Sequence, residues 1–131
     1  MFGDQIPRLA HLHARDTSLV VVARAPLDEI EALKARLCWR FPFVSTGEAF
    51  NHDFGVTDGF GLNVFLKYGD GGMYGTYFTD RRGVETLGTP WTRLDLTPYG
   101  RQERWQDAPS ATPQSAPCEW WRLNDAYHET P

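Results

Sequence analysis

The chain has 131 residues, a length typical of one domain and sufficient to bury a core without a metal or a disulfide. Hydrophobic residues make up 41% and charged residues 23%, a balance that excludes a wholly disordered chain. The formal net charge of −4, with no stripe of Lys or Arg, argues against nucleic acid as a partner.

The sequence carries no sign of export or of a membrane span. Residues 1–4 show no basic region followed by a long apolar one, and the longest apolar run, residues 19–23, is far too short to cross a bilayer. We therefore expect a cytoplasmic protein without a membrane partner. Cys38 and Cys118 lie 80 positions apart (118 − 38), form no CxxC and have no metal-site spacing, so we expect two reduced thiols.

The first half of the chain alternates helix and strand patterns. Helical spacing of apolar residues predicts a short helix over residues 7–14. Residues 17–24, TSLVVVAR, form an apolar β-branched run typical of a strand covered on both faces. A second helix follows Pro26, with acidic residues in its first turn and an apolar face made by Leu27, Ile30, Leu33 and Leu37.

Further along, the pattern becomes strand-rich. Residues 39–45 read as a short edge strand because they contain Pro42, and residues 48–54 as one or two helical turns. Residues 62–68 and 73–79 flank a Gly-rich turn and predict a β-hairpin. Residues 82–87 could start another helix, although Gly83 and Gly88 weaken that pattern. We expect a buried core that includes Val20, Val21, Val22, Ile30, Leu33, Val64 and Phe65.

Composition suggests a domain over residues 1–107. Residues 108–117 are rich in Pro, Ser and Ala and predict a mobile linker. Residues 118–131 form a tail, which we expect to pack back on the domain. Helix–strand alternation followed by a hairpin predicts an α/β fold with a mixed sheet and helices on both faces.

Several stretches, in this order, resemble a known bacterial family. They are residues 11–46, FNHDFGV (50–56), LDLTPYGR (94–101) and WWRLNDAYHE (120–129). The family is domain of unknown function 899, described as predicted dithiol-disulfide oxidoreductases with a thioredoxin-like fold. The resemblance covers most of the chain and implies a thioredoxin-like mixed sheet flanked by helices.

The resemblance also implies an opening strand and a loop carrying a cysteine pair. Residues 1–3 look like the end of that strand, and no cysteine pair follows them. The chain thus resembles a divergent short member whose first strand and cysteine loop are missing or much reduced. Because dithiol exchange needs an attacking thiolate and a resolving thiol within reach, we expect no dithiol-disulfide oxidoreductase activity.

A missing central strand would leave strand edges without partners. Residues 17–24 and 62–68 could pair directly, a strand from elsewhere in the chain could fill the gap, or a second copy could pair across the edge. We expect the last arrangement, a homodimer with two-fold symmetry.

Candidate site residues are of two kinds. Arg24 follows an apolar strand, where α/β sheets gather ligands, and it could bind an anion or pair with the acidic start of the next helix. Four aromatic side chains could line a substrate pocket at the seam of the expected homodimer: Trp39, Phe41, Phe43 and Tyr77. His52 and Asp53 are candidates for acid–base catalysis. His11 and His13 are poorly spaced on a helix for one ion, so we expect no metal and no cofactor.

These observations favour a non-redox, thioredoxin-like protein that binds a small, partly aromatic molecule, with a place in secondary metabolism. One alternative is an enzyme that uses His52 and Asp53 on such a molecule. Another is an interaction or scaffold subunit. The high aromatic content, 14%, supports the binding hypothesis, since large rings line pockets as well as cores.

Overall fold

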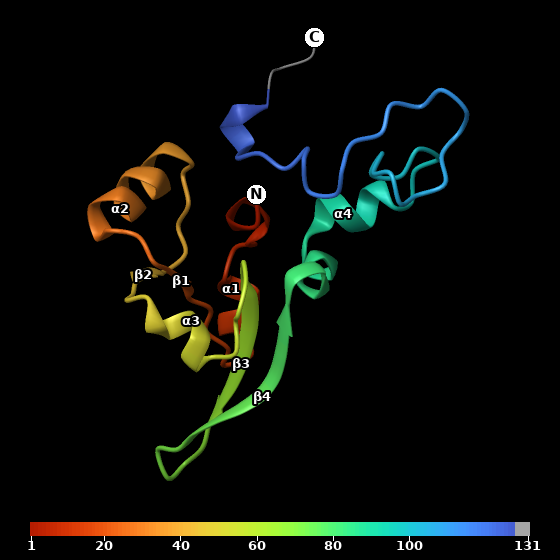
Figure 1. Cartoon of the computed structure of the whole chain (residues 1–131). Coiled ribbons are helices and arrows are strands. Elements are labelled where there is room, and N and C mark those ends of the chain that lie inside the picture. The colour runs from red at the N-terminus through yellow and green to blue at the C-terminus, as the bar shows by residue number, and fades with distance from the viewer. Residues whose placement is uncertain (128–131) are drawn as a thin grey trace. The chain divides into compact units, whose positions relative to one another are not determined.

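The computed structural model describes residues 1–127, and its fold class is α/β (Figure 1). Short helices and short strands alternate in the first part of the chain, and a β-hairpin and further short helices follow. In order, the elements are η1 (Gly3–Gln5), α1 (Ala10–His13), β1 (Val21–Ala23), α2 (Leu27–Arg36), β2 (Phe43–Ser45), α3 (Ala49–Asp53), β3 (Gly61–Lys67), β4 (Met73–Asp80), η2 (Arg81–Leu87), α4 (Thr89–Leu94) and η3 (Asn124–Ala126).

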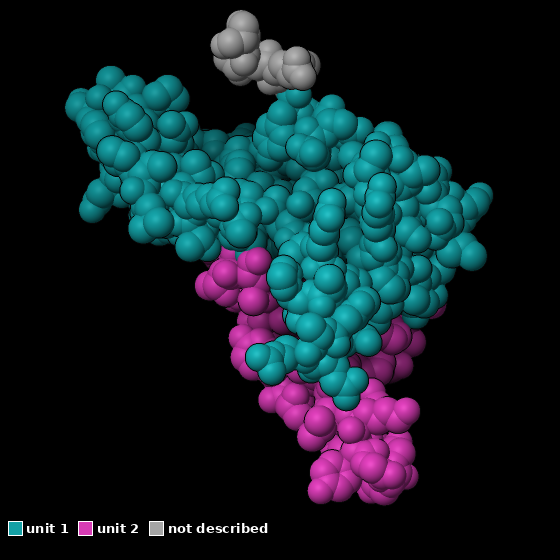
Figure 2. Space-filling view, turned by 180° about the vertical axis from the view of Figure 1, so that it is seen from behind, with its two compact units in different colours: residues 1–46, 88–131 teal, residues 47–87 magenta. Residues whose placement is uncertain are grey.

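The chain divides into two compact units, coloured separately in Figure 2. Unit 1 contains residues 1–46 and the chain from residue 88 onward, and unit 2 contains residues 47–87. This division differs from the expected domain, linker and tail. The Pro-rich residues 108–117 belong to unit 1, where they form part of a pocket described below.

Helix α2 forms where the apolar spacing predicts it, and its Ile30 is buried. The helix ends in a Schellman-type turn, in which the Trp39 N–H donates to the Lys34 carbonyl at 2.9 Å. Cys38 takes the left-handed position of that turn, with φ of 56°. A cysteine thus stands where glycine is usual, which ties it to a structural role in ending the helix.

Strands β1 and β2 pair in parallel, through the pairs Val21–Phe43, Val22–Val44 and Ala23–Ser45. Both are shorter than the predicted strands. Pro42 has no N–H to donate, although its carbonyl accepts a hydrogen bond from Val21 at 3.0 Å. The residues before β1 have no partner strand in the described chain, so the ladder ends there.

The predicted hairpin is confirmed, since β3 and β4 pair antiparallel along their full length. A bulge opposite Val64 leaves Thr76 outside the register, and the Thr76 hydroxyl donates to the Val64 carbonyl at 3.2 Å. On one face Phe65 meets Phe54, just after α3, edge to face at 5.6 Å. The short helix therefore covers only that face of the hairpin.

The parallel pair and the hairpin form two separate two-stranded sheets, whereas the sequence predicted one mixed sheet. Residues 1–3, expected to end a strand, instead turn into η1, and Phe2 has helical backbone angles. The Trp39 ring packs so closely on Gly3 that a Cβ there would overlap it, and the Trp39 indole donates to Asp4 at 3.1 Å. These side-chain contacts favour a turn over a strand.

Helix α4 lies in a stretch where the sequence analysis expected no element. Gly88 is its N-cap residue and Pro90 stands in the first turn, where a missing N–H costs little. Its Trp91 is completely buried. The same Gly and Pro that weaken a helix pattern therefore mark where this helix begins.

The core prediction is right for Ile30 and wrong for three other residues. Val21, Val22 and Leu33 are half-buried. Val20, Val64 and Phe65 are 53%, 40% and 41% exposed, because Val20 precedes the ladder and the hairpin has only two strands. The buried hydrophobic residues are Ile30, Phe41, Val56, Val84 and Trp91.

Candidate functional site

Three of the aromatic candidates form one cluster in unit 1. The ring centroids of Trp39 and Phe41 are 5.3 Å apart, and those of Phe41 and Phe43 are 6.1 Å apart. Phe41 is only 6% exposed, so this cluster is packed as core. Tyr77 lies on β4 in unit 2 and is 55% exposed, so it belongs to another part of the chain.

Arg24 follows β1 directly, as the sequence predicted, and is exposed. Within residues 1–127 its side chain makes neither an ion pair nor a hydrogen bond, so the expected pairing with the start of α2 does not form. The neighbouring edge is closed by the chain itself, since the Ser45 hydroxyl donates to the Ala25 carbonyl at 2.6 Å. Arg24 therefore stands exposed at the carboxyl end of β1.

His52 and Asp53 lie side by side at the end of α3. His52 Nδ1 is 3.8 Å from Asp53 Oδ1, and the two side chains are 88% and 64% exposed. Acid–base catalysis usually relies on groups held in a cleft, where water is excluded and substrate is positioned. The structure supplies the pair without such a cleft.

The two cysteines are both exposed, and no disulfide joins them. Within the described residues, no group of three or more His, Cys, Asp or Glu side chains gathers to hold a metal ion, and His11 and His13 are exposed. Across residues 1–127, no helix combines the length and apolar character that a membrane span needs.

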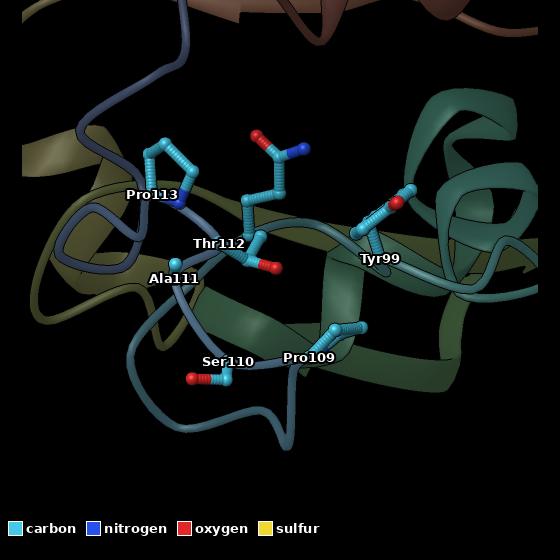
Figure 3. Close-up of a pocket in the computed structure, with 7 residues that line it drawn as sticks. Tyr99, Pro109, Ser110, Ala111, Thr112 and Pro113 are labelled. Atoms are coloured by element: carbon cyan, nitrogen blue, oxygen red, sulfur yellow. The ribbon is translucent and has the colours of Figure 1, made fainter.

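A pocket of about 320 Å³ lies in unit 1, where the sequence analysis placed a linker. It opens between the turn after α4 and the Pro-rich segment, as Figure 3 shows. Its volume is at the small end of ligand pockets in proteins. The lining residues are Tyr99, Gln102, Pro109, Ser110, Ala111, Thr112 and Pro113.

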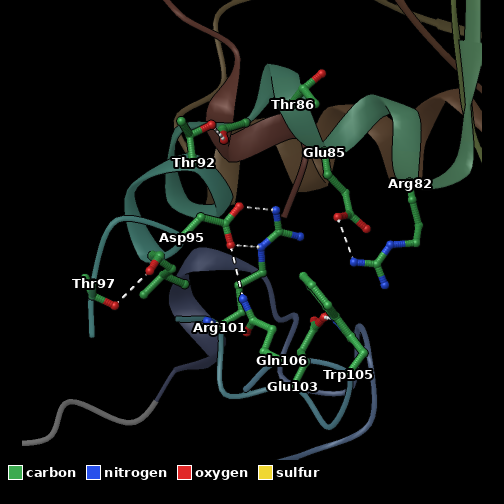
Figure 4. A network of polar contacts seen from close by, with 12 residues as sticks. Arg82, Glu85, Thr86, Thr92, Asp95, Thr97, Arg101, Glu103, Trp105 and Gln106 are labelled. Carbon is green, nitrogen blue, oxygen red and sulfur yellow. Dashed lines mark hydrogen bonds and ion pairs between the residues drawn. The ribbon is translucent and has the colours of Figure 1, made fainter. Parts of the chain in front are cut away.

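The first wall of the pocket is fixed by an ion-pair network behind it (Figure 4). The Arg101 guanidinium donates to both carboxylate oxygens of Asp95, at 2.7 and 2.6 Å. Such bidentate pairs are geometrically specific. The Gln106 side chain accepts the Arg101 backbone N–H at 2.7 Å. These contacts close the loop that presents Tyr99 and Gln102.

The second wall is tied to the first by hydrogen bonds across its base. The Ser115 N–H donates to the carbonyl of Gln102 at 2.9 Å, and the Arg104 N–H donates to the Ser115 carbonyl at 3.0 Å. The Gln114 side-chain amide donates to the carbonyl of Gln106 at 2.9 Å. Gln114 and Ser115, near the end of the predicted linker, are therefore hydrogen-bonded to the preceding turn.

Beneath this base lies Glu103, a carboxylate that is only 1% exposed. The indole N–H groups of Trp105 and Trp120 donate to it at 2.5 and 2.8 Å, and the Cys118 backbone N–H donates at 3.1 Å. A buried carboxylate needs such donors, since its desolvation is costly. Glu103 thus joins the pocket's base to residues 118–120.

Two lining residues have strained backbones. Gln102 has φ of 56° and Ala111 has φ of 68°, in the left-handed region that residues with a Cβ rarely adopt. Ala111 occupies the third position of a turn closed by the Thr112 N–H on the Pro109 carbonyl at 3.1 Å, where glycine or asparagine is usual. Both residues therefore hold a backbone conformation that the local contacts must maintain.

The lining is polar but uncharged. It offers the Tyr99 and Thr112 hydroxyls, the Gln102 amide and the Ser110 hydroxyl. No hydrogen bond from these side chains to residues 1–127 is formed, so their donors and acceptors face solvent or a ligand. Tyr99 adds a ring that is about half exposed, and the prolines add apolar edges.

Sequence reasoning missed this pocket because its composition matches that of a flexible linker. The available signals were Tyr99 in the LDLTPYGR stretch and two prolines that frame a short segment. The network of Asp95, Arg101 and Gln106 that rigidifies the pocket depends on side chains facing one another. Their sequence spacing alone does not reveal that arrangement.

Fold and site define a small α/β protein with an uncharged, ring-bearing pocket. A model of the family described as bacterial protein of unknown function (DUF899) matches residues 1–127, and the chain belongs to this family. The comparison with curated proteins found no match, and neither did the comparison with solved structures.

Proposed function

We propose that this protein binds a small, uncharged, partly aromatic molecule in the pocket between Tyr99 and Pro113. The observation that carries the proposal is the pocket's lining, in which one exposed ring stands among neutral hydrogen-bonding groups that have no partner in residues 1–127. Such a mixture of an apolar face and a few polar groups is typical of small-molecule sites. The absence of a charged lining residue favours a neutral ligand.

The rigid support of the pocket strengthens this proposal. The Asp95–Arg101 ion pair stabilises the first wall, and the Gln114 amide bonds the end of the second wall to Gln106, which reduces the conformational entropy lost on binding. Pre-organisation is what distinguishes a binding pocket from the chance hollow of a mobile loop. The turn that the Thr112 N–H closes on the Pro109 carbonyl holds Ala111 in its left-handed conformation.

Phenol is a suitable first probe, and its binding can be measured by ligand-observed NMR. We expect Tyr99→Ala to weaken phenol binding roughly 3- to 10-fold, the range that an aromatic pair contributes. Tyr74→Ala is the matched control, because both rings are 52% exposed and Tyr74 lies on the hairpin in unit 2. Equal losses in the two variants would argue against the pocket.

Two further variants separate this pocket from the site predicted by sequence. Phe43→Leu and Tyr77→Ala alter the aromatic residues first expected to bind the molecule. We expect both to bind phenol as the parent does. Binding lost in these variants and kept in Tyr99→Ala would place the ligand elsewhere.

The thioredoxin-like classification is also a proposal, and it rests on the resemblance in sequence. The structure contains a parallel strand pair and an antiparallel hairpin, the two kinds of pairing that a mixed sheet combines, but here they form two separate sheets. A non-redox role, a place in secondary metabolism and a cytoplasmic location stay predictions. The enzyme alternative also stays a prediction, and its test is loss of activity in His52→Ala with the fold intact.

A second candidate function, self-association, is favoured by the uncovered face of the hairpin. The side chains of Val64, Leu66, Tyr74 and Tyr77 share one face and are 40–55% exposed. At roughly 150–250 Å² per aromatic ring, they leave an apolar patch on the order of 400 Å², a size that often marks a contact surface. We propose that a second copy of this chain covers the face, because the face has no charged side chain that would call for an oppositely charged partner.

The expected dimer is weak, because a stable one buries about 800 Å² per partner and this patch supplies about half of that. Light scattering behind size exclusion should show a concentration-dependent rise above the monomer mass in the high micromolar range. Leu66→Lys, which places a charge on the patch, should abolish the rise. A constant monomer mass over that range would remove the homodimer hypothesis.

A further inference from the structure

The strongest remaining observation concerns the Gln102 side chain in the proposed binding pocket. Its amide offers one carbonyl acceptor and one NH₂ donor side by side. Within residues 1–127 neither group makes a hydrogen bond, although Gln102 lines the pocket. Many exposed glutamines have an amide without a hydrogen-bond partner. Gln102 differs from them in its backbone, which the neighbouring chain holds in a fixed conformation.

Gln102 is held in a left-handed conformation, with φ of 56°, by contacts on both sides of it. Its own N–H donates to the Tyr99 carbonyl at 3.3 Å, and its carbonyl accepts the Ser115 N–H at 2.9 Å. The main chain at this position is therefore fixed on both sides. This fixes the point at which the side chain leaves the main chain, in the pocket that Tyr99 also lines.

An amide that stands beside an aromatic ring can recognise a flat molecule in two ways at once. The ring stacks on its face, while the amide forms two parallel hydrogen bonds with an edge that carries an N–H next to a C=O. Glutamine and asparagine make the same paired contact with the edge of adenine in nucleic acid recognition. An edge of this kind is found in cyclic lactams and in nucleobase-like heterocycles.

We infer that the ligand is an uncharged planar heterocycle with a cis-amide edge, and that Gln102 reads that edge while Tyr99 stacks on the ring. The inference rests on the proposed function, and it narrows the ligand class from partly aromatic molecules to this group. The Ser110 and Thr112 hydroxyls add neutral donors and acceptors around the same ring.

A matched pair of probes tests the inference: 2-pyridone, which has the cis-amide edge, and N-methyl-2-pyridone, in which a methyl group blocks the N–H. We expect the protein to bind 2-pyridone about 10-fold more tightly, the discrimination that a paired hydrogen bond provides. In Gln102→Met, which keeps the side chain's length and removes both polar groups, the ratio should fall to about one. Titrations followed by NMR give both affinities.

A second variant tests the inference independently if Gln102→Met does not fold. Gln102→Glu replaces the donor with a second acceptor, so it should lose the preference for 2-pyridone and favour the protonated form of 2-aminopyridine, whose ring N–H and amino group are both donors. A parent ratio near one, or a ratio unchanged in Gln102→Met, would overturn the inference. If phenol then still bound in a Tyr99-dependent way, the proposed function would stand and only the ligand class would be wrong.

Discussion

Replacing Trp91 with alanine is expected to lower the free energy of unfolding by about 3–5 kcal/mol, the range for removing a buried aromatic side chain. Trp91 has no exposed surface. Its ring stacks on Phe2 with centroids 4.7 Å apart and meets Trp121 edge to face at 5.2 Å. The substitution therefore removes the ring that joins three distant segments of unit 1. Urea unfolding followed by circular dichroism measures the loss.

Trp91→Phe is the matched control for this experiment. It keeps a ring between Phe2 and Trp121 and removes an indole N–H that has no hydrogen-bond partner within the described residues. Leaving a buried donor unsatisfied is costly, so its removal offsets part of the lost packing. We expect less than half the loss seen with alanine. A cost below about 1 kcal/mol for Trp91→Ala would show that this cluster is not the core of unit 1.

The second large effect concerns Glu103. Glu103→Gln keeps the shape of the side chain and replaces one acceptor oxygen with a donor NH₂ that faces an indole N–H. The carboxylate accepts hydrogen bonds from Trp105, Trp120 and Cys118, and both of its oxygens are used. We expect a loss of about 2 kcal/mol in the free energy of unfolding, because bonds to charged groups are strong and a displaced donor stays unsatisfied.

The Glu103→Gln substitution should also weaken ligand binding in the pocket. Its backbone carbonyl accepts the Gln114 amide at 3.2 Å, and the neighbouring Gln102 lines the cavity. We expect weaker phenol binding in Glu103→Gln even where the protein remains folded. Glu29→Gln, an exposed glutamate in the first turn of α2, should change stability by less than about 0.5 kcal/mol. Similar losses in both variants would mean that the buried carboxylate has no special role.

Local patterns predicted the elements that depend on local interactions. The apolar spacing around Ile30 gave α2, and the glycines between residues 68 and 73 gave the hairpin. Pairing partners were harder to predict, because a strand's neighbour depends on distant residues. The opening residues illustrate this point: Gly3 and Asp4 form a turn through contacts with Trp39, far away in sequence.

The candidate pocket shares none of its residues with the site predicted from the sequence. Trp39, Phe41 and Phe43 pack on one another, while Tyr99, which the sequence analysis did not single out, lines the pocket. The wall at residues 109–113 has a composition that usually means flexibility. The Gln114 and Ser115 hydrogen bonds and the left-handed conformation of Ala111 give this wall its structure. No local sequence pattern predicts these features.

The central claim is that a small aromatic molecule binds between Tyr99 and Pro113. The position of the bound molecule can be mapped directly by NMR. A ¹⁵N-labelled sample titrated with phenol should show saturable shifts of the amide signals of Gln102, Ser110, Ala111 and Thr112, all of which line the pocket. The signals of Arg24, Phe43 and Tyr77 should stay in place. Shifts confined to those three residues, or no saturable shift at the pocket, would contradict the account.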